Sequence, residues 1–237
     1  MRRVFAFATG NIWRWSKSRT KLIDYAKKFD IDGVEITFSS KEELYKFKLN
    51  NSQIKWLRRR DYVSIHSPFK LVRKAGSEKE VKKQLDYIYK LYKKVNAKNV
   101  VIHAKDLPEP NVLYKYKMRF STENTIRKSN VSIGKLAMIL KRYRNLGLCL
   151  DVSHAYFWSK DETGRLVNRF KRKITQVHFS GNYKKKDHTP LRIVSANFIK
   201  SIQPIKKLDV PIIIEEDIKI KNIKWVKNEI KYIKSLF

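Results

Sequence analysis

The sequence predicts a (β/α)8 barrel (TIM barrel), an α/β fold in which parallel strands alternate with helices around one axis. Short, nearly continuous apolar runs recur along the chain and alternate with amphipathic helical patterns, which is typical of a parallel sheet covered on its outside. Eight such units can be marked, the number that the barrel requires. The GxGxxG turn of a doubly wound dinucleotide-binding sheet is missing, and there are only seven glycines.

The expected elements follow one another without a break. The expected strands are Val4–Ala8, Gly33–Thr37, Tyr62–His66, Asn99–His103, Lys117–Glu123, Gly147–Asp151, Ile174–Phe179 and Pro211–Glu215. The expected helices are Lys21–Phe29, Glu42–Phe47, Glu78–Val95, Ile133–Arg144, Leu166–Phe170, Ala196–Lys206 and Ile223–Leu236. In Glu78–Val95 the apolar positions recur every three or four residues, which marks one buried helix face. No repeat or linker divides the chain, so we expect one domain over residues 1–237.

The charge of the chain predicts a polyanionic partner. Its 54 Lys and Arg against 22 Asp and Glu give a net charge of +32, which attracts nucleic acid. A thermophile's surface is the alternative, but such surfaces usually balance lysine with glutamate. The single cysteine, Cys149, excludes an internal disulfide and cysteine-rich zinc motifs. Without a long apolar run or a signal-peptide core, we expect a cytoplasmic protein with no membrane contact.

Every histidine lies at or shortly after the end of an apolar run, and several carboxylates lie at equivalent places. The histidines are His66, His103, His154, His178 and His188, and the carboxylates are Glu123, Asp151 and Glu215. In a barrel the carboxyl ends of the strands meet on one face, so these side chains would gather there. Imidazole and carboxylate are ligands of zinc, manganese and iron, and the pattern therefore predicts a multi-metal site.

The segments around these residues resemble a known family. They are Ser64-Ile65-His66-Ser67-Pro68-Phe69, Val101-Ile102-His103, Thr122-Glu123-Asn124-Thr125, Leu148-Cys149-Leu150-Asp151-Val152-Ser153-His154-Ala155 and Pro211-Ile212-Ile213-Ile214-Glu215. Together they resemble endonuclease IV, the metal-dependent apurinic/apyrimidinic (AP) endonuclease family 2 within the xylose-isomerase-like TIM barrels.

The resemblance implies two or three divalent ions, with zinc as the usual metal and manganese as an alternative. The implied ligands are His66, His103 and bridging Glu123 for the first ion, then Asp151, His178 and Glu215 for the second, and His154, Asp187 and His188 for the third. The family has Asp-x-His at the third ion, whereas Asp187 and His188 are adjacent here. The family's usual histidine in the first strand is also absent.

The activity that the resemblance implies is hydrolysis of the phosphodiester at an abasic site in damaged duplex DNA by a metal-activated hydroxide. We expect a monomeric DNA-repair hydrolase in which Glu123 is the catalytic residue, bridging ions and orienting the hydroxide. Phe69 would contact the damaged nucleotide or fill the opened base stack. Lys184, Lys185 and Lys186 would bind phosphates from the catalytic face, with Lys70 and Arg73 as second choices.

Other functions share parts of this pattern. Val177-His178-Phe179-Ser180 looks as much like ultraviolet-damage endonucleases. The segments 32–35 and 188–191 are similar to sugar isomerases or epimerases, in which one divalent ion would polarise a ketose and stabilise an enediolate. That ion's implied ligands are Glu123, Asp151, His178 and Glu215. A basic nucleic-acid-binding barrel with a decayed site is the non-enzymatic alternative.

Several residues have a structural interpretation beside the functional one. Glu35 is expected to be a buried strand-end carboxylate paired with Lys or Arg. Asp151 could cap the turn after its strand, although His154 three residues on favours a ligand pair. Residues 13–15 (Trp-Arg-Trp) could contact DNA or pack on the first helix, and residues 58–60 (Arg-Arg-Arg) are expected on the bottom face.

Overall fold

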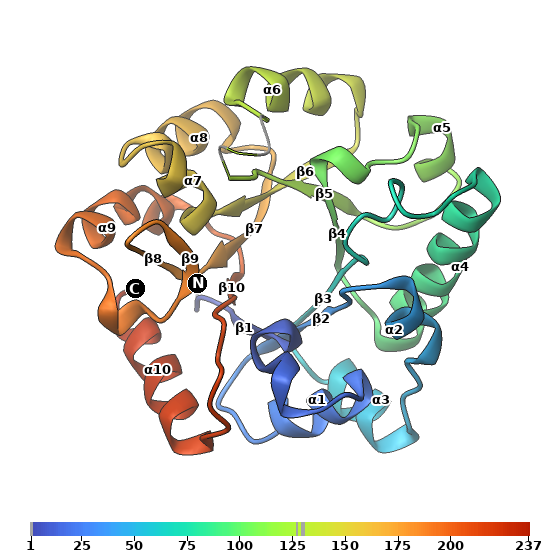
Figure 1. The fold of residues 1–237 in the computed structure, drawn as a ribbon, viewed down its shortest axis with the longest axis horizontal. Helices are drawn as coiled ribbons and strands as arrows, with labels where there is room; N and C mark the ends of the chain where they lie inside the picture. Colours follow the sequence, from blue (N-terminus) through green and yellow to red (C-terminus); the bar gives the residue numbers. More distant parts are fainter. Residues whose placement is uncertain (1, 127, 129–130) are drawn as a thin grey trace.

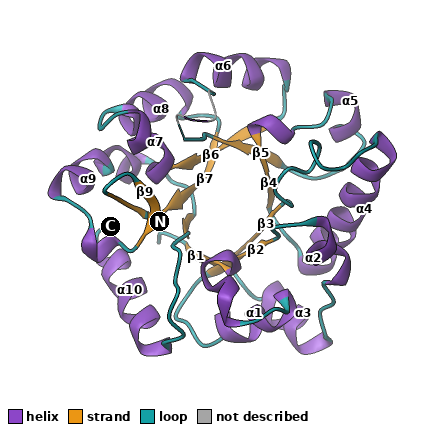
Figure 2. Cartoon of the chain, in the orientation of Figure 1, coloured by secondary structure: helices purple, strands orange, loops and turns teal. Residues whose placement is uncertain are grey.

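The predicted (β/α)8 barrel is confirmed by the computed structural model, which describes residues 2–126, 128 and 131–237. Eight parallel strands close in the order β1-β10-β7-β6-β5-β4-β3-β2. They are β1 (Phe5–Ala8), β2 (Gly33–Thr37), β3 (Tyr62–His66), β4 (Asn99–His103), β5 (Phe120–Glu123), β6 (Leu146–Asp151), β7 (Ile174–Phe179) and β10 (Ile212–Ile214). The helices surround the strands as an outer ring (Figures 1 and 2).

The helices follow the apolar periodicity with differences at their ends. Their bounds are α1 (Arg19–Ala26), α2 (Lys41–Lys46), α3 (Asn51–Arg58), α4 (Glu78–Val95), α5 (Pro110–Leu113), α6 (Ile133–Arg142), α7 (Val152–Trp158), α8 (Glu162–Phe170), α9 (Ala196–Ser201) and α10 (Ile223–Ser235). The expected helix over 196–206 is split, because Pro204 cannot continue α9 and a 3-10 turn over Gln203–Lys207 follows. None of the helices in the described ranges is long and apolar enough to cross a bilayer.

Four strand starts differ from the expected runs, and β1 and β10 each begin one residue late, at Phe5 and Ile212. The expected strand from Lys117 begins only at Phe120, because a turn in which the Met118 amide donates to the Tyr116 carbonyl precedes it. Strand β6 begins one residue early, at Leu146. The carboxyl ends of the strands, which carry the candidate ligands, agree to within one residue of the expected bounds throughout.

The main apolar core lies between the strands and the helix ring, and it includes the buried face of α4 that the periodicity predicts. The barrel interior is different, because much of it is polar. A small apolar cluster of Ala6, Ala8 and Ile213 lies apart from the main core. Elsewhere in the interior, the side-chain amide of Gln176 donates to Glu35 (2.8 Å) and accepts from Asn99 (3.0 Å), which forms a buried hydrogen-bonded layer. This layer lies under the carboxyl ends of the strands.

A hairpin that the sequence did not predict follows β7. Its strands, β8 (Gly181–Tyr183) and β9 (Lys186–Thr189), pair antiparallel. The two turn residues, Lys184 and Lys185, both have positive φ (50° and 61°), as a two-residue type I′ turn requires. This turn is usually indicated by Asn-Gly or Asp-Gly in the sequence, and two lysines do not predict it. The hairpin is tied to α7, because the Ser153 hydroxyl donates to the Gly181 carbonyl at 2.9 Å.

Candidate metal centre

The carboxyl ends of the strands and the segments that follow them bring the predicted ligands together at one end of the barrel. In neighbouring strands His103 is opposite Glu123, and Asp151 is opposite His178. Three groups of side chains result, and within each group one ligand atom of every member lies within 4.8 Å of the others. The groups are His66, His103 and Glu123; Glu123, Asp151, His178 and Glu215; and Asp151, His154 and His188. These groups use eight of the nine predicted ligands.

Glu123 lies at the centre of the cluster, as its expected bridging role requires. Its Oε2 atom lies 3.5 Å from Nε2 of both His66 and His103. Its Oε1 atom lies 3.0 Å from Nδ1 of His154 and 3.6 Å from Nδ1 of His178. The side chain is 2% exposed, so a single buried carboxylate faces histidines of all three groups.

The second group fits a cation rather than a set of hydrogen bonds. His178 Nδ1 and Glu215 Oε2 are buried and lie 2.7 Å apart, yet neither atom forms a hydrogen bond of ordinary geometry with any residue that the structure describes. Asp151 Oδ2 is likewise buried without a partner. Buried polar atoms without partners are costly, and a bound ion would satisfy all three of these at once. Nitrogen and oxygen donors of this kind suit zinc or manganese.

Backbone carbonyls fix the tautomers of three histidines. Nδ1 of His66 donates to the Ser67 carbonyl at 2.9 Å, and Nδ1 of His188 donates to the Glu215 carbonyl at 2.9 Å. Nδ1 of His154 lies 3.0 Å from the carbonyl of Asn124, which again can only accept. Each ring therefore keeps Nε2 as the nitrogen with a free lone pair for a metal.

The third group differs in one member from the implied ligand set. His154 and His188 are grouped with Asp151, whereas Asp187 Oδ2 lies 3.7 Å from His154 Nε2 and is outside the group. Asp151 serves two roles, because its Oδ1 accepts from the His154 amide (2.6 Å) and caps α7 while Oδ2 stays free. The capping and ligand interpretations of Asp151 are therefore compatible.

The acidic and basic side chains of the cluster shift one another's pKa. Burial raises the pKa of Asp151 to about 6, although His154 opposes this shift. Burial would lower the pKa of His154, but Asp151 and Glu123 raise it to about 10. Burial would raise the pKa of Glu215, but His178 beside it brings the value to about 2. Without an ion, His154 therefore holds a second proton that a metal would have to displace.

Glu35 is buried as expected, but among the described residues its charged partner is His178 rather than Lys or Arg, which corrects the expectation from the sequence. Its side chain points into the barrel and is 0% exposed. Its Oε1 atom lies 3.0 Å from His178 Nε2, and its Oε2 atom accepts from the Ser64 hydroxyl at 2.8 Å. Burial would raise the pKa of Glu35, but His178 holds it below its usual value. Ser64 and Gln176 are polar residues inside otherwise apolar strands, and they could have indicated the buried hydrogen-bonded layer from the sequence.

Asn124 is a second residue to which the sequence assigned no role. Its side-chain amide donates to the Asp151 carbonyl and its oxygen accepts from the Asp151 amide, both at 2.8 Å. This pair of hydrogen bonds fixes the end of β6 against the end of β5. The Glu-Asn-Thr motif therefore joins a ligand to the residue that positions the neighbouring ligand.

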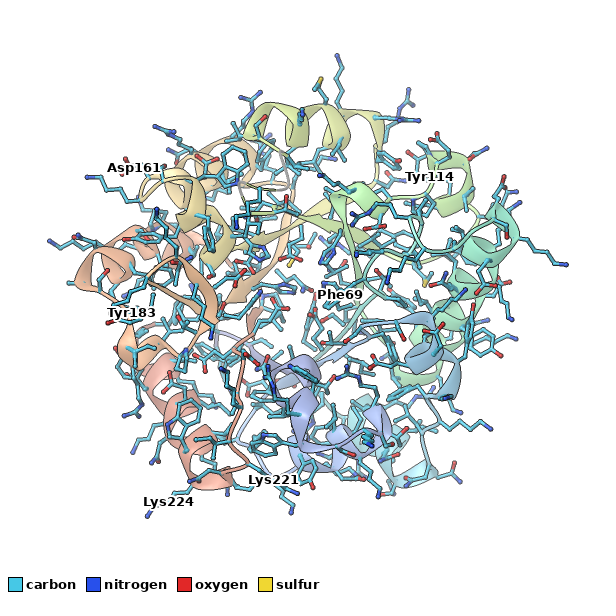
Figure 3. The ribbon with its side chains drawn as sticks, in the orientation of Figure 1. Phe69, Tyr114, Asp161, Tyr183, Lys221 and Lys224 are labelled. Carbon is cyan, nitrogen blue, oxygen red and sulfur yellow. The ribbon has the colours of Figure 1, made fainter. Side chains whose placement is uncertain are left out.

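A cavity of about 600 Å³ opens over the cluster, and Phe69, Trp13, Lys186 and His188 are among its lining residues. Phe69 is 41% exposed and stacks on the His103 ring, with 5.2 Å between ring centroids and 11° between planes. Figure 3 shows Phe69 at the mouth of the barrel. Trp13 is 46% exposed. Phe69 and Trp13 thus reach the space above the candidate metal centre.

The basic residues divide between the two ends of the barrel. Lys184, Lys185 and Lys186 lie exposed on the hairpin, and Lys70 is exposed beside Phe69. Residues 58–60 end α3 and precede the amino end of β3, on the opposite face as expected. Arg73 is bound to the buried Asp106, with 2.6 Å between Nη2 and Oδ2, and its side chain is half exposed.

Of residues 13–15, which could contact DNA, Arg14 and Trp15 are bound to other parts of the protein. Trp15 is buried, with its ring 5.5 Å from that of Tyr25 on α1, as the packing alternative for this loop predicted. Arg14 forms an ion pair with Asp217 and lies over the Trp13 ring. Only Trp13 of this loop therefore offers an exposed aromatic face.

Known structures share the whole fold at low sequence identity. No family model matches the chain, and no curated protein matches it in sequence. A D-tagatose 3-epimerase-like protein matches with a TM-score of 0.70 and 17% identity over 98% of both chains. The probable 3-DHS dehydratase AsbF from Bacillus anthracis matches with 0.75 and 13%, over 97% of this chain and 98% of that one. Endonuclease IV from Thermus thermophilus matches with 0.68 and 14% over 98% of both. The fold is thus common to an endonuclease, an epimerase-like protein and a dehydratase.

Proposed function

We propose that this chain is a metal-dependent endonuclease that hydrolyses the phosphodiester at abasic sites in DNA. The observation that carries the proposal is the number and arrangement of ligands, with Glu123 facing histidines of three adjoining groups. One ion needs about four ligands, so eight grouped side chains indicate more than one ion. The net charge of +32 supports a polyanionic substrate.

The chain's own side chains supply binding, orientation and exclusion of water. Bound divalent ions would provide hydroxide near neutral pH and offset negative charge on the phosphate and the leaving oxygen. Glu123, buried and in contact with histidines on both sides, would hold the attacking oxygen in line with the phosphorus. Phe69, stacked on His103 and half exposed above the first group, would contact the extrahelical nucleotide.

A sugar isomerase or epimerase is the second candidate, favoured by the fold match to the epimerase-like protein. The group of Glu123, Asp151, His178 and Glu215 would by itself complete a site for one ion. That function leaves His66, His103, His154 and His188 without a role at the same face. An ultraviolet-damage endonuclease would use the whole cluster, and a panel of lesions separates it from an abasic-site enzyme.

The test is incision of a duplex with one abasic site by the metal-loaded protein and by Glu123→Gln. We expect cleavage on the 5′ side of the lesion by the wild type and none by the variant, while the far-ultraviolet circular dichroism of both is the same. Full activity of Glu123→Gln would contradict the multi-metal mechanism. Isomerisation of a ketose without DNA cleavage would favour the second candidate.

A further inference from the structure

A second cavity, of about 520 Å³, adjoins the candidate metal centre on the outer side of the β8–β9 hairpin. The segment between β10 and α10 forms its other wall. Its exposed surface is mainly apolar and comes from Tyr183, Pro190, Ile193, Ile218, Ile220 and Trp225, among other lining residues. Figure 3 shows Tyr183 on the hairpin, away from Phe69 at the barrel mouth.

His188 lines both this cavity and the cavity over the candidate metal centre. Lys186 and Asp217 also line both spaces. The backbone of His188 is in the left-handed region (φ 50°), and its carbonyl accepts from the Asp217 amide at 2.7 Å. The Ile218 amide, at the buried base of the cavity, donates to the Asn11 carbonyl at 2.9 Å. The two spaces are therefore fixed next to each other by backbone hydrogen bonds.

The apolar lining is open to solvent. Ile220 is 77% exposed, Ile193 50% and Tyr183 40%, which makes a cluster of large exposed apolar side chains beside a catalytic face. Such a patch marks a binding site more often than isolated exposed residues do. The aromatic rings of Tyr183 and Trp225 suit a flat ligand that stacks.

Cationic side chains accompany these apolar walls. Lys186 and Lys219 line the cavity itself, and Lys184 lies 5.3 Å from the centre of the Tyr183 ring. A flat apolar group joined to phosphates matches this combination, whereas an apolar peptide segment would leave the lysines unused. Because His188 is common to both spaces, a ligand with its phosphate at the metal centre could place an adjacent base in this cavity.

From this arrangement we infer that the cavity binds one unpaired nucleobase of the DNA strand whose phosphodiester lies at the metal centre. This inference rests on the proposed function. The base must be unpaired, since a stacked and paired base cannot leave the duplex without an energetic cost. The site would therefore favour lesions that have an unpaired base next to the abasic position.

The experiment uses two DNA duplexes that differ by one base. Both have an abasic analogue with a non-hydrolysable methylphosphonate on its 5′ side. In one, the neighbouring nucleotide faces an abasic position and is unpaired; in the other, that nucleotide also lacks its base. We expect the metal-loaded wild type to bind the first duplex at least about fivefold more tightly, as stacking of one base implies. Equal affinities for the two duplexes would overturn the inference.

The cavity variants are Ile220→Ser and Ile193→Ser, both at exposed positions of the cavity. The matched control is Met138→Ser, because Met138 lies on α6 and is 65% exposed. We expect the two cavity variants to lose the preference for the base and the control to keep it. Retention of the preference in both cavity variants would contradict the assignment. A second result would also contradict the assignment: the wild type is a dimer with no base preference, and Ile220→Ser makes it monomeric. The cavity would then bind a second copy of the chain.

Incision of an ordinary abasic duplex, measured in parallel, separates this inference from the proposed function. Base preference without incision would support the cavity and refute the endonuclease. Incision without base preference would support the endonuclease and refute the base-binding cavity. Ile220→Ser should incise the ordinary duplex at the wild-type rate, because Ile220 lies outside the ligand groups.

Discussion

The carboxylate of Glu35 lies 3.0 Å from Nε2 of His178, while Nδ1 of the same ring lies 2.7 Å from Glu215. Glu35 therefore faces the ring nitrogen that points away from the second ligand group. A carboxylate in this place retains the proton on Nε2 and leaves Nδ1 available as a ligand. We propose that Glu35 is a positioning residue that would act on the candidate metal centre through His178.

We predict that Glu35→Gln weakens metal binding about 10- to 100-fold, the usual effect of losing a partner behind a histidine ligand. The new amide would donate to Nε2, which places the ring proton on Nδ1 and blocks it as a ligand. Competition with a chromogenic chelator measures the affinity. Ser64→Ala is the control, because it removes a hydrogen bond to Glu35 but leaves the carboxylate in front of His178. Unchanged affinity in Glu35→Gln would refute the positioning role.

Asp187 and His188 should contribute unequally to the third ligand group. His188 is in the group with Asp151 and His154, whereas Asp187 only approaches His154. We predict that His188→Ala binds one ion fewer per chain than the wild type, while Asp187→Asn binds the same number. The metal content of purified proteins, measured by mass spectrometry, decides this. Loss of an ion in Asp187→Asn as well as in His188→Ala would instead support the adjacent pair implied by the family resemblance.

The lysines of the hairpin turn should contact DNA phosphates. We predict that Lys184→Gln and Lys185→Gln each reduce the slope of log affinity against log salt by about 0.9, because one phosphate contact is lost. Titrations of an abasic duplex at several salt concentrations measure the slope. Arg59→Gln, exposed at the end of α3 on the opposite face, is the matched control and should leave the slope unchanged. Equal effects of all three changes would indicate a diffuse field rather than a binding face.

Glu216 should make the fold less stable as pH rises. Its Oε1 accepts from the Leu191 amide, which also donates to Glu229, and burial together with that second carboxylate raises the pKa of Glu216 well above its usual value. The unfolded chain ionises near pH 4.5, so stability is lost as pH rises from there through the higher pKa of the folded state.

Removing this acid should reverse the effect. We predict that Glu216→Gln melts a few degrees above the wild type at pH 8, in the presence of a chelator, and that the difference disappears toward pH 4. Thermal denaturation at both pH values is the measurement. Glu109→Gln, at an exposed position, should show little shift at either pH. A variant less stable than the wild type at pH 8 would show that the carboxylate is ionised there.

Much of the barrel could be predicted because each strand is marked by a short run of neighbouring residues in the sequence. Apolar runs that end in His66, His103 or Asp151 mark both the strands and their carboxyl ends, and parallel pairing then brings those ends together. The segment after β6 was harder, because α7 depends on one side-chain cap from Asp151 rather than on a long periodic pattern. The hairpin was missed because its strands are short and polar and its turn has lysines at positive φ.

The Glu35–His178 contact could not be predicted because it crosses the barrel interior from β2 to β7. Sequence spacing specifies which face of a strand a residue occupies but not which distant strand it meets. The same limit applies to His188, whose grouping with Asp151 depends on the path of the hairpin. Residue types predicted the chemistry of the cluster, while its exact partners required the fold.

The proposed mechanism requires more than one ion to act with Glu123 on DNA. The most direct measurement titrates metal-free protein with zinc or manganese and follows bound ions and incision of an abasic duplex in the same samples. We predict two or three ions per chain, with cleavage on the 5′ side of the lesion appearing only after the first equivalent is bound. Saturation at one ion with no cleavage at any salt concentration would contradict the account.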